Sequence, residues 1–287
     1  MLRTEIDSLT PSRDFSRRDF VQATVGSGFA AAVLPVTAQT VTTDTAGLTA
    51  GAVTIDVAGF KMPAYRAQPA GKTGLPVILV VSEIFGVHEH IADVARRFAK
   101  LGYLAIAPEL FVRQGDAKAY TDIPKLVSEI VAKASDAQVL GDLDAAVAWA
   151  KANGGDTTRL GITGFCWGGR ITWMYAAHNP GVKAGVAWYG PTARAYHTGD
   201  KSPLDVAAQI KGAMLGLYGG ADGGIPNDTV EKMRDAVKAA GNSKVEVVIY
   251  PDTPHAFHAD YRPSYRKEQA EDGWKRCTAW FKTHVMG

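Results

Sequence analysis

The sequence predicts an α/β fold in which a mostly parallel, twisted sheet is covered by helices on both faces. Short apolar runs rich in β-branched residues alternate along the chain with longer segments of helical periodicity. The run 76–82 (PVILVVS) is almost wholly apolar, which is typical of a parallel strand buried on both faces. The 287 residues are 46% hydrophobic, enough for one large domain with a packed core.

The predicted order of elements begins with an antiparallel hairpin around Gly59. Strands are expected, in chain order, at residues 53–57, 62–67, 76–82, 103–107, 160–163, 184–188, 213–218 and 245–250. Helices are expected at residues 90–101, 123–134, 137–153, 170–178, 228–240 and 265–284. Because strands and helices alternate after the hairpin, the sheet that follows it should be mostly parallel.

The first 38 residues have the pattern of an export signal. Paired arginines in SRRDF (16–20) precede an apolar run of small residues, and VTA (36–38) resembles a cleavage site. This pattern resembles a twin-arginine signal, so we expect the twin-arginine export machinery as a partner and a periplasmic location. An alternative is an anchoring or amphipathic helix, but the apolar run is shorter than the roughly 20 residues that span a bilayer. No stable membrane span is therefore expected after cleavage.

The remainder of the chain is expected to be a linker followed by one domain. Residues 39–50 are polar and rich in threonine, which predicts a linker, and residues 51–287 carry the alternating strands and helices. The formal net charge is only +2, and no stretch clusters Lys and Arg with aromatic residues, so we expect no nucleic acid as partner. A small molecule is the expected substrate.

A cysteine lies at a predicted turn between a strand and a helix. In GFCWGG (164–169), glycines flank Cys166, and the helix is expected to begin at Trp167. This is the pattern of a nucleophile elbow, in which a strained central residue projects its side chain above the sheet edge. A helix N-terminus favours a thiolate, and the Trp167 N–H can point to a developing oxyanion. The alternative is a buried small residue in a turn that needs glycine for packing.

Partners for this nucleophile follow two later strands. Asp222 ends GGAD (219–222), and His255 lies shortly after the strand at 245–250. Their order along the chain, nucleophile, acid and histidine, is that of the triad on such a sheet, with Asp222 orienting the imidazole. Asp252 and Asp228 are weaker candidates for the acid.

Another candidate site group follows the apolar strand at 76–82. Glu83 should face the same sheet edge as Cys166, where it can hold the thiol by a hydrogen bond. The Ile84 N–H can complete the oxyanion hole begun by Trp167. Alternatively, Glu83 caps a helix or is exposed.

No metal or other cofactor is expected. The histidines in HEH (88–90), and the pair His255 and His258, match neither HExxH nor paired CxxC motifs. The chain has two cysteines, Cys166 and Cys277, and a disulfide between them is an alternative in an oxidising compartment. Cys277 instead falls on the apolar face of a predicted helix, which favours simple burial.

Taken together, the motifs resemble the dienelactone hydrolase (carboxymethylenebutenolidase) family of α/β-hydrolases. The resemblance runs from about residue 53 to residue 280 and rests on EIFG (83–86), APELF (107–111), GFCWGG (164–169), GGAD (219–222) and HAF (255–257). It implies an α/β-hydrolase fold, with Cys166 as nucleophile, His255 as base and Asp222 as its partner. It also implies that Glu83 binds the resting thiol until substrate displaces it.

The chain departs from this family at the substrate carboxylate. Members that cleave dienelactone hold that group with arginines, one of them four residues after the catalytic histidine, where this chain has Ala259. Arg113 is the only arginine in the segment that would carry another, and Arg262 or His258 are possible replacements. Aromatic side chains that can line an apolar pocket are Trp167, Trp188, Tyr189 and Tyr196.

The sequence therefore predicts an exported hydrolase that cleaves small esters or lactones through a thioester intermediate. One alternative is a thioesterase on the same fold, which acyl-chain specificity would distinguish. A second is a binding protein that keeps the fold without catalysis, and a third is a thiol redox protein, for which only Cys277 is available as a resolving cysteine.

Overall fold

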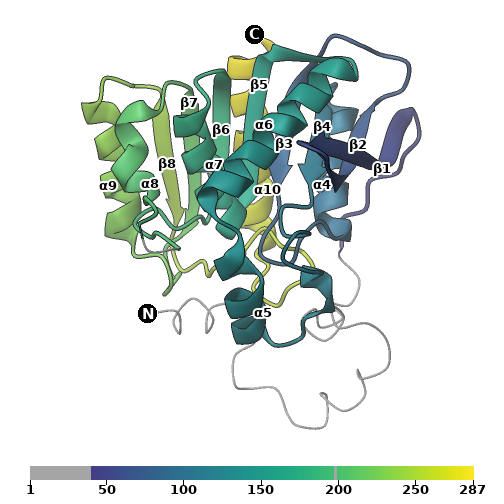
Figure 1. Cartoon of the computed structure of the whole chain (residues 1–287). Coiled ribbons are helices and arrows are strands. Elements are labelled where there is room, and N and C mark those ends of the chain that lie inside the picture. The colour runs from purple at the N-terminus through teal and green to yellow at the C-terminus, as the bar shows by residue number, and fades with distance from the viewer. Residues whose placement is uncertain (1–39, 197–198) are drawn as a thin grey trace.

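In the computed structural model, residues 40–196 and 199–287 are described, and they build one eight-stranded sheet with helices on both faces (Figure 1). The predicted export signal, residues 1–38, lies outside the described residues. Within the part of the chain that is described, no helix is both long and apolar enough to cross a bilayer.

The sheet is antiparallel at one edge and parallel elsewhere. Its spatial order is β1-β2-β4-β3-β5-β6-β7-β8, with β1 antiparallel to β2 and β2 antiparallel to β4. The remaining neighbours are parallel. The strands are β1 (Leu48–Val57), β2 (Phe60–Pro69), β3 (Leu75–Val81), β4 (Leu104–Pro108), β5 (Gly155–Phe165), β6 (Val182–Trp188), β7 (Ala213–Gly219) and β8 (Val245–Tyr250).

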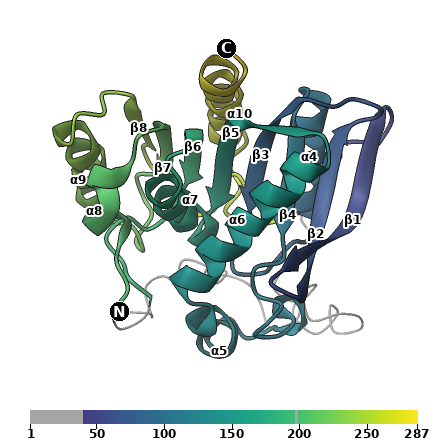
Figure 2. The ribbon, with the colours of Figure 1, turned by 45° about the horizontal axis from the view of Figure 1, so that its top comes forward.

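Helices cover both faces of the sheet. The α-helices in the described residues are α4 (Glu89–Lys100), α5 (Ile123–Glu129), α6 (Asp136–Ala152), α7 (Trp167–His178), α8 (Pro203–Val206), α9 (Asn227–Ala239) and α10 (Lys267–Phe281). In Figure 1, α6 and α7 cross in front of the sheet, and α10 lies behind it. Helix α4 shares the face of α10, since Phe98 contacts Trp274 and Phe281. Figure 2 shows α8 and α9 beside β7 and β8.

Burial follows the position of each strand in the sheet. In β3, every residue after Leu75 is buried, and all of β4 is buried, because helices cover both faces there. Edge strand β1 instead consists of exposed and partly buried residues, with Ile55 alone buried. The apolar run at 76–82 was therefore correctly predicted to be a central parallel strand.

The parallel strands bring the predicted site residues to one edge of the sheet. Strands β3, β5, β6, β7 and β8 run in the same direction, so their carboxyl ends lie along a single edge. The residues that directly follow these strands meet there, which is the usual position of a binding site in an open α/β sheet.

Several predicted boundaries differ from the structure, among them the start of β5 at Gly155 instead of residue 160. The expected linker at 39–50 is wrong, because β1 already begins at Leu48 and the Val41 and Thr43 N–H groups donate hydrogen bonds to Asp260 and Asp93. The helix expected at 123–134 is interrupted, since α5 ends at Glu129 and a short 3-10 turn follows. The last α-helix ends at Phe281 and continues as a π-helical turn.

The contact between α7 and the end of β3 leaves no room for a side chain at Gly168. A Cβ there would lie 2.5 Å from the carbonyl oxygens of Val81 and Ser82. We expect Gly168→Ala to lower the free energy of unfolding by about 3 kcal/mol, measured by urea denaturation. Gly141→Ala is the control, because Gly141 is exposed within α6 with no atom near its Cβ position, and it should stabilise the protein by up to about 1 kcal/mol. A Gly168→Ala variant as stable as the wild type would contradict this account.

Candidate active site

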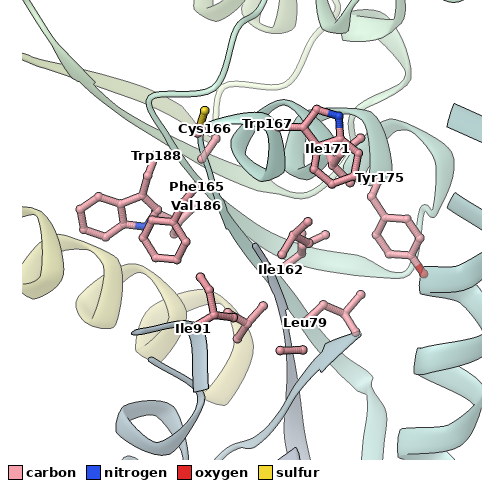
Figure 3. Packing of buried hydrophobic residues seen from close by; sticks show 14 of the residues in the cluster. Leu79, Ile91, Ile162, Phe165, Cys166, Trp167, Ile171, Tyr175, Val186 and Trp188 are labelled. Carbon is pink, nitrogen blue, oxygen red and sulfur yellow. The ribbon is translucent and has the colours of Figure 1, made fainter. Parts of the chain in front are cut away.

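Cys166 occupies a strained turn between β5 and α7. Its backbone has φ 55° and ψ −119°, a left-handed conformation that is uncommon for a residue with a side chain. The Cys166 N–H donates to the Trp188 carbonyl oxygen at 3.0 Å, which ties the turn to the end of β6. In Figure 3 the sulfur lies where strand and helix meet, with Phe165 and Trp188 on one side of the chain and Trp167 on the other. The local geometry is that of a nucleophile elbow.

The flanking glycines allow this turn to form. A Cβ on Gly164 would lie 2.2 Å from the Gly168 carbonyl oxygen, so the strand end and the first turn of the helix are in direct backbone contact. The sequence pattern therefore predicted the turn for the correct physical reason. Cys166 itself is only 4% exposed.

His255 and Asp222 form a buried pair beside the nucleophile. The His255 Nδ1 atom lies 2.6 Å from Asp222 Oδ2, and His255 is 1% exposed. The other carboxylate oxygen of Asp222 accepts the Gly224 N–H at 2.9 Å. His255 Nε2 is buried and has no hydrogen-bond partner among the described residues. With Nδ1 on the carboxylate, Nε2 is the nitrogen left to exchange a proton at the reaction centre.

Electrostatics favour the protonated form of His255. Burial alone would lower the pKa of this imidazole, but the charges of Asp222 and, next, of the Cys166 sulfur raise it to about 10. The weaker candidates for the acid do not share this position. Asp228 is exposed and pairs with Lys232 at 2.8 Å, and Asp252 is exposed after β8.

The N–H groups of Trp167 and Ile84, which were predicted to stabilise an oxyanion, lie on two segments that contact each other. Trp167 is the first residue of α7, so its N–H has no acceptor within the helix. Ile84 is buried just beyond the end of β3. Because Gly168 packs directly on the backbone of Val81 and Ser82, the start of α7 and the segment that carries Ile84 are neighbours.

Glu83 binds His88 and Tyr261 and not the Cys166 thiol, which was its predicted partner. Its Oε2 lies 3.1 Å from His88 Nε2, and its Oε1 accepts a hydrogen bond from the Tyr261 hydroxyl at 3.2 Å. Burial alone would raise the pKa of Glu83, but the charge and hydrogen bond of His88 lower it to about 2. Among the described residues, no hydrogen bond joins Glu83 to Cys166. The carboxylate is ionised and engaged by His88 and Tyr261 instead of holding the thiol.

The histidines that resemble a metal motif are each used in another way. His88 binds Glu83, and His90 Nδ1 lies 2.9 Å from Asp260 Oδ1. His258 is packed between aromatic rings, 4.4 Å from the Trp188 ring centroid and 5.2 Å from that of Phe165. In the described part of the chain, no three His, Cys, Asp or Glu residues are grouped so that they could hold a metal ion. Cys277 and Cys166 are both free thiols.

Three buried tyrosines interact electrostatically with Cys166. Burial raises the pKa of Tyr189, Tyr196 and Tyr261, and a charge on the Cys166 sulfur adds to this effect in each case. All three phenols are therefore within electrostatic reach of the sulfur. The motif search found Tyr189 and Tyr196 but not Tyr261, which lies in an irregular loop six residues after His255.

The three residues considered as anchors for a substrate carboxylate, Arg113, His258 and Arg262, lie in different surroundings. Arg262 is 7% exposed, lies 5.5 Å from the Phe85 ring centroid, and lowers the pKa of both Tyr189 and Tyr261, against the larger effect of burial. Arg113 instead forms an ion pair with Asp142. His258 packs against Phe165, Trp188 and Trp274. Of these three candidates, Arg262 is the one that interacts electrostatically with Tyr189 and Tyr261.

A buried ion pair that the sequence analysis missed supports the wall of the site. Arg170 on α7 binds both carboxylate oxygens of Asp136, at 2.7 and 2.6 Å. The same guanidinium donates to the carbonyl oxygens of Arg194 and Lys201 and lies 5.1 Å from the Tyr196 ring centroid. Such bidentate pairs fix geometry as well as charge. The segment that carries Tyr196 is thereby tied to the nucleophile helix.

The fold and this site define the class of the protein. A mostly parallel sheet, an elbow after β5, an acidic residue after β7 and a histidine after β8 are the arrangement of the α/β-hydrolases.

Comparison with known proteins narrows the class to a family. A model described as "Dienelactone hydrolase family" matches residues 62–285, and the chain belongs to this family. A Methylorubrum extorquens protein named "Putative carboxymethylenebutenolidase" is 57% identical over 288 residues, covering 98% of this chain and 97% of the relative. An Escherichia coli protein of the same name is 55% identical over 265 residues, covering 90% and 96%. The crystal structure of "Putative Dienelactone Hydrolase" from Klebsiella pneumoniae has a TM-score of 0.79 and 55% identity, covering 83% of this chain and 99% of that one.

The raised pKa of His255 links stability to pH. The pKa rises from 6.5 to about 10 on folding, so this group stabilises the protein fully below about pH 6.5 and loses that contribution as the pH rises through 10. We expect the free energy of unfolding to fall between these two pH values by at least about 1 kcal/mol more in the wild type than in His255→Gln. Urea denaturation at several pH values measures the difference. If the free energy of unfolding changed with pH by the same amount in both proteins, the pairing with Asp222 would not keep His255 protonated in the folded state.

Proposed function

We propose that this protein hydrolyses small esters or lactones, with Cys166 as the nucleophile. The observation that carries the proposal is the position of the His255 imidazole, which is fixed by Asp222 on one side and open at Nε2 toward the strained Cys166 turn. A nucleophile, a base and a group that orients the base are the elements of covalent acyl transfer.

In the first half of the reaction, the Cys166 thiol gives its proton to His255 Nε2, and the resulting thiolate attacks the carbonyl carbon of the substrate. The negative charge that develops on the carbonyl oxygen is stabilised by the N–H groups of Trp167 and Ile84. The bond between the carbonyl carbon and the leaving oxygen then breaks, and protonated His255 donates its Nε2 proton to that oxygen. A thioester remains on Cys166, and in a lactone the alcohol stays attached to the acyl group.

In the second half, water hydrolyses the thioester. His255 Nε2 accepts a proton from the water as its oxygen attacks the thioester carbon, and the same two N–H groups stabilise the second oxyanion. The carbon–sulfur bond breaks, the product leaves as a carboxylic acid, and Cys166 and His255 return to their starting state. Asp222 keeps Nδ1 occupied throughout, so that only Nε2 exchanges protons.

The surroundings of Cys166 favour a small substrate with a polar or anionic end. The tyrosines Tyr189, Tyr196 and Tyr261 offer aromatic contact area, and Arg262 supplies positive charge close to two of them. We propose that Arg262 takes the role that family members give to an arginine at the position of Ala259. The names of the relatives point to an enol lactone as the first compound to assay.

The triad proposal is tested by removing one member at a time. We expect Cys166→Ala to abolish turnover of p-nitrophenyl acetate and of a small lactone, because no nucleophile remains. Asp222→Asn should lower kcat by about 10³-fold to 10⁴-fold, because the histidine is no longer held in the correct tautomer. Initial rates, with melting temperatures to confirm folding, measure both effects.

Asp228→Asn is the matched control, since Asp228 is an exposed acid paired with Lys232. It should leave kcat unchanged. Hydrolysis that persists in Cys166→Ala would exclude this cysteine as nucleophile. Full activity in Asp222→Asn would exclude the triad.

We also propose that the protein is exported in folded form to the periplasm. The support is the SRRDF sequence (16–20), followed by an apolar run of small residues and VTA (36–38). A folded domain with two buried free cysteines suits a route that carries folded cargo.

The export proposal predicts a dependence on the paired arginines. In a bacterium that has the twin-arginine route, the full chain should appear in the periplasmic fraction, shortened by its signal. Replacing Arg17 and Arg18 together by Lys should leave almost all of the protein uncleaved in the cytoplasm, as measured by fractionation and mass spectrometry. Unchanged export of the double variant would argue against this route.

A further inference from the structure

Tyr189 has a buried hydroxyl group that the mechanism above does not use. The residue directly follows β6 and is 0% exposed. Its hydroxyl has no hydrogen-bond partner among the described residues. Such a group is exceptional in a folded protein, because a buried polar atom is normally paired.

Other buried tyrosines in the structure show the ordinary arrangement. The Tyr218 hydroxyl donates to the Gly190 carbonyl oxygen at 3.0 Å and accepts the indole N–H of Trp173 at 3.0 Å. The Tyr175 hydroxyl donates to Asp144 at 2.9 Å. Tyr189 differs in this respect from Tyr175 and Tyr218, whose hydroxyl groups are both paired.

The backbone of Tyr189 is strained and firmly held. Its φ of 39° is unusual for a bulky residue. Its N–H donates to the Leu217 carbonyl oxygen at 2.8 Å, while the carbonyl oxygen of Trp188 accepts the Cys166 N–H. A Cβ on Gly169 would lie 2.5 Å from that same Trp188 oxygen, so α7 presses on this turn. Strain that the surroundings maintain in this way is concentrated at functional sites.

The ring of Tyr189 lies beside the catalytic pair. Its centroid is 5.1 Å from that of His255, with the two ring planes at 63°, and 5.3 Å from that of Phe257. Burial raises the pKa of Tyr189 well above its usual value, and the charges of Glu83, Tyr261 and Cys166 raise it further. The hydroxyl therefore remains a hydrogen-bond donor throughout the neutral pH range.

The sheet order places Tyr189 on a defined side of the nucleophile. Cys166 follows β5, whose neighbours are β3 on one side and β6 on the other. Ile84, which serves the oxyanion, comes from the β3 side. Tyr189 comes from the β6 side, as does His255, which follows β8 further along. In the proposed mechanism the leaving group takes its proton from His255, which places it on that side.

We propose that the Tyr189 hydroxyl donates a hydrogen bond to the leaving oxygen of the substrate, the alkoxy oxygen of an ester or the ring oxygen of a lactone. This inference rests on the proposed function. As the carbon–oxygen bond breaks, negative charge grows on that oxygen, and the hydrogen bond strengthens. Tyr189 keeps its own proton, and the proton that completes the leaving alcohol still comes from His255.

The experiment compares Tyr189→Phe with wild type on acetate esters of different leaving groups. p-Nitrophenolate leaves readily without help, whereas an alkoxide needs stabilisation. We therefore expect Tyr189→Phe to lower kcat/KM about 100-fold for ethyl acetate and for a small lactone, but less than about threefold for p-nitrophenyl acetate. The phenylalanine keeps the ring contacts and removes an unpaired hydroxyl, so the melting temperature should not fall.

Tyr218→Phe is the matched control, because its hydroxyl is equally buried but paired with Gly190 and Trp173. It should lower the melting temperature and change all substrates by the same factor. An equal loss for all leaving groups in Tyr189→Phe, or no loss, would overturn the inference while Cys166→Ala remains inactive. If wild type hydrolyses none of these compounds, or if Cys166→Ala remains active, the proposed function fails and this inference fails with it.

Discussion

The active site depends on a backbone contact that side chains would prevent. The start of α7 packs against the ends of β3, β5 and β6, at the positions of Gly168, Gly164 and Gly169. This contact forces Cys166 and Tyr189 into left-handed backbone conformations on adjacent strands. It also brings the segment after β3 close to the first free N–H groups of the helix. One steric constraint thus sets Cys166, the N–H groups of Trp167 and Ile84, and the strained Tyr189 in fixed relative positions.

Around this rigid centre the buried carboxylates each bind a buried hydrogen-bond donor. Asp222 binds His255, Glu83 binds His88 and Tyr261, and Asp136 binds Arg170. Each carboxylate compensates the burial of its partner, because a charge left alone in such surroundings would be strongly destabilising. The pairs also explain the opposite directions of the pKa changes, upward for His255 and downward for Glu83.

Most of the fold and the positions of the candidate triad residues could be predicted from the sequence. Buried parallel strands have continuous apolar runs, and GFCWGG needs its glycines for local steric reasons, so both signals lie within short segments. The partners of Glu83 could not be predicted, because Tyr261 comes from 178 residues further along the chain and lies in an irregular loop. Arg170 and Asp136 were missed for a similar reason, since a charged residue on a helix usually indicates exposure. The prediction of a linker at 39–50 was wrong because the polar side chains of this segment give no sign that its backbone N–H groups bind buried carboxylates.

The hydrogen bonds of Val41 and Thr43 also bear on how much of the N-terminus can be removed. Val41 donates to Asp260, five residues after His255, and Asp260 in turn binds His90, while Thr43 donates to Asp93 on α4. The segment that carries Val41 and Thr43 thus acts as a clasp on the loop that carries His255. Processing after Ala38 would leave this clasp intact, whereas trimming past Thr43 would leave two buried carboxylates short of donors. The proposed cleavage position and the integrity of the loop that carries His255 are therefore linked through the hydrogen bonds of this short segment.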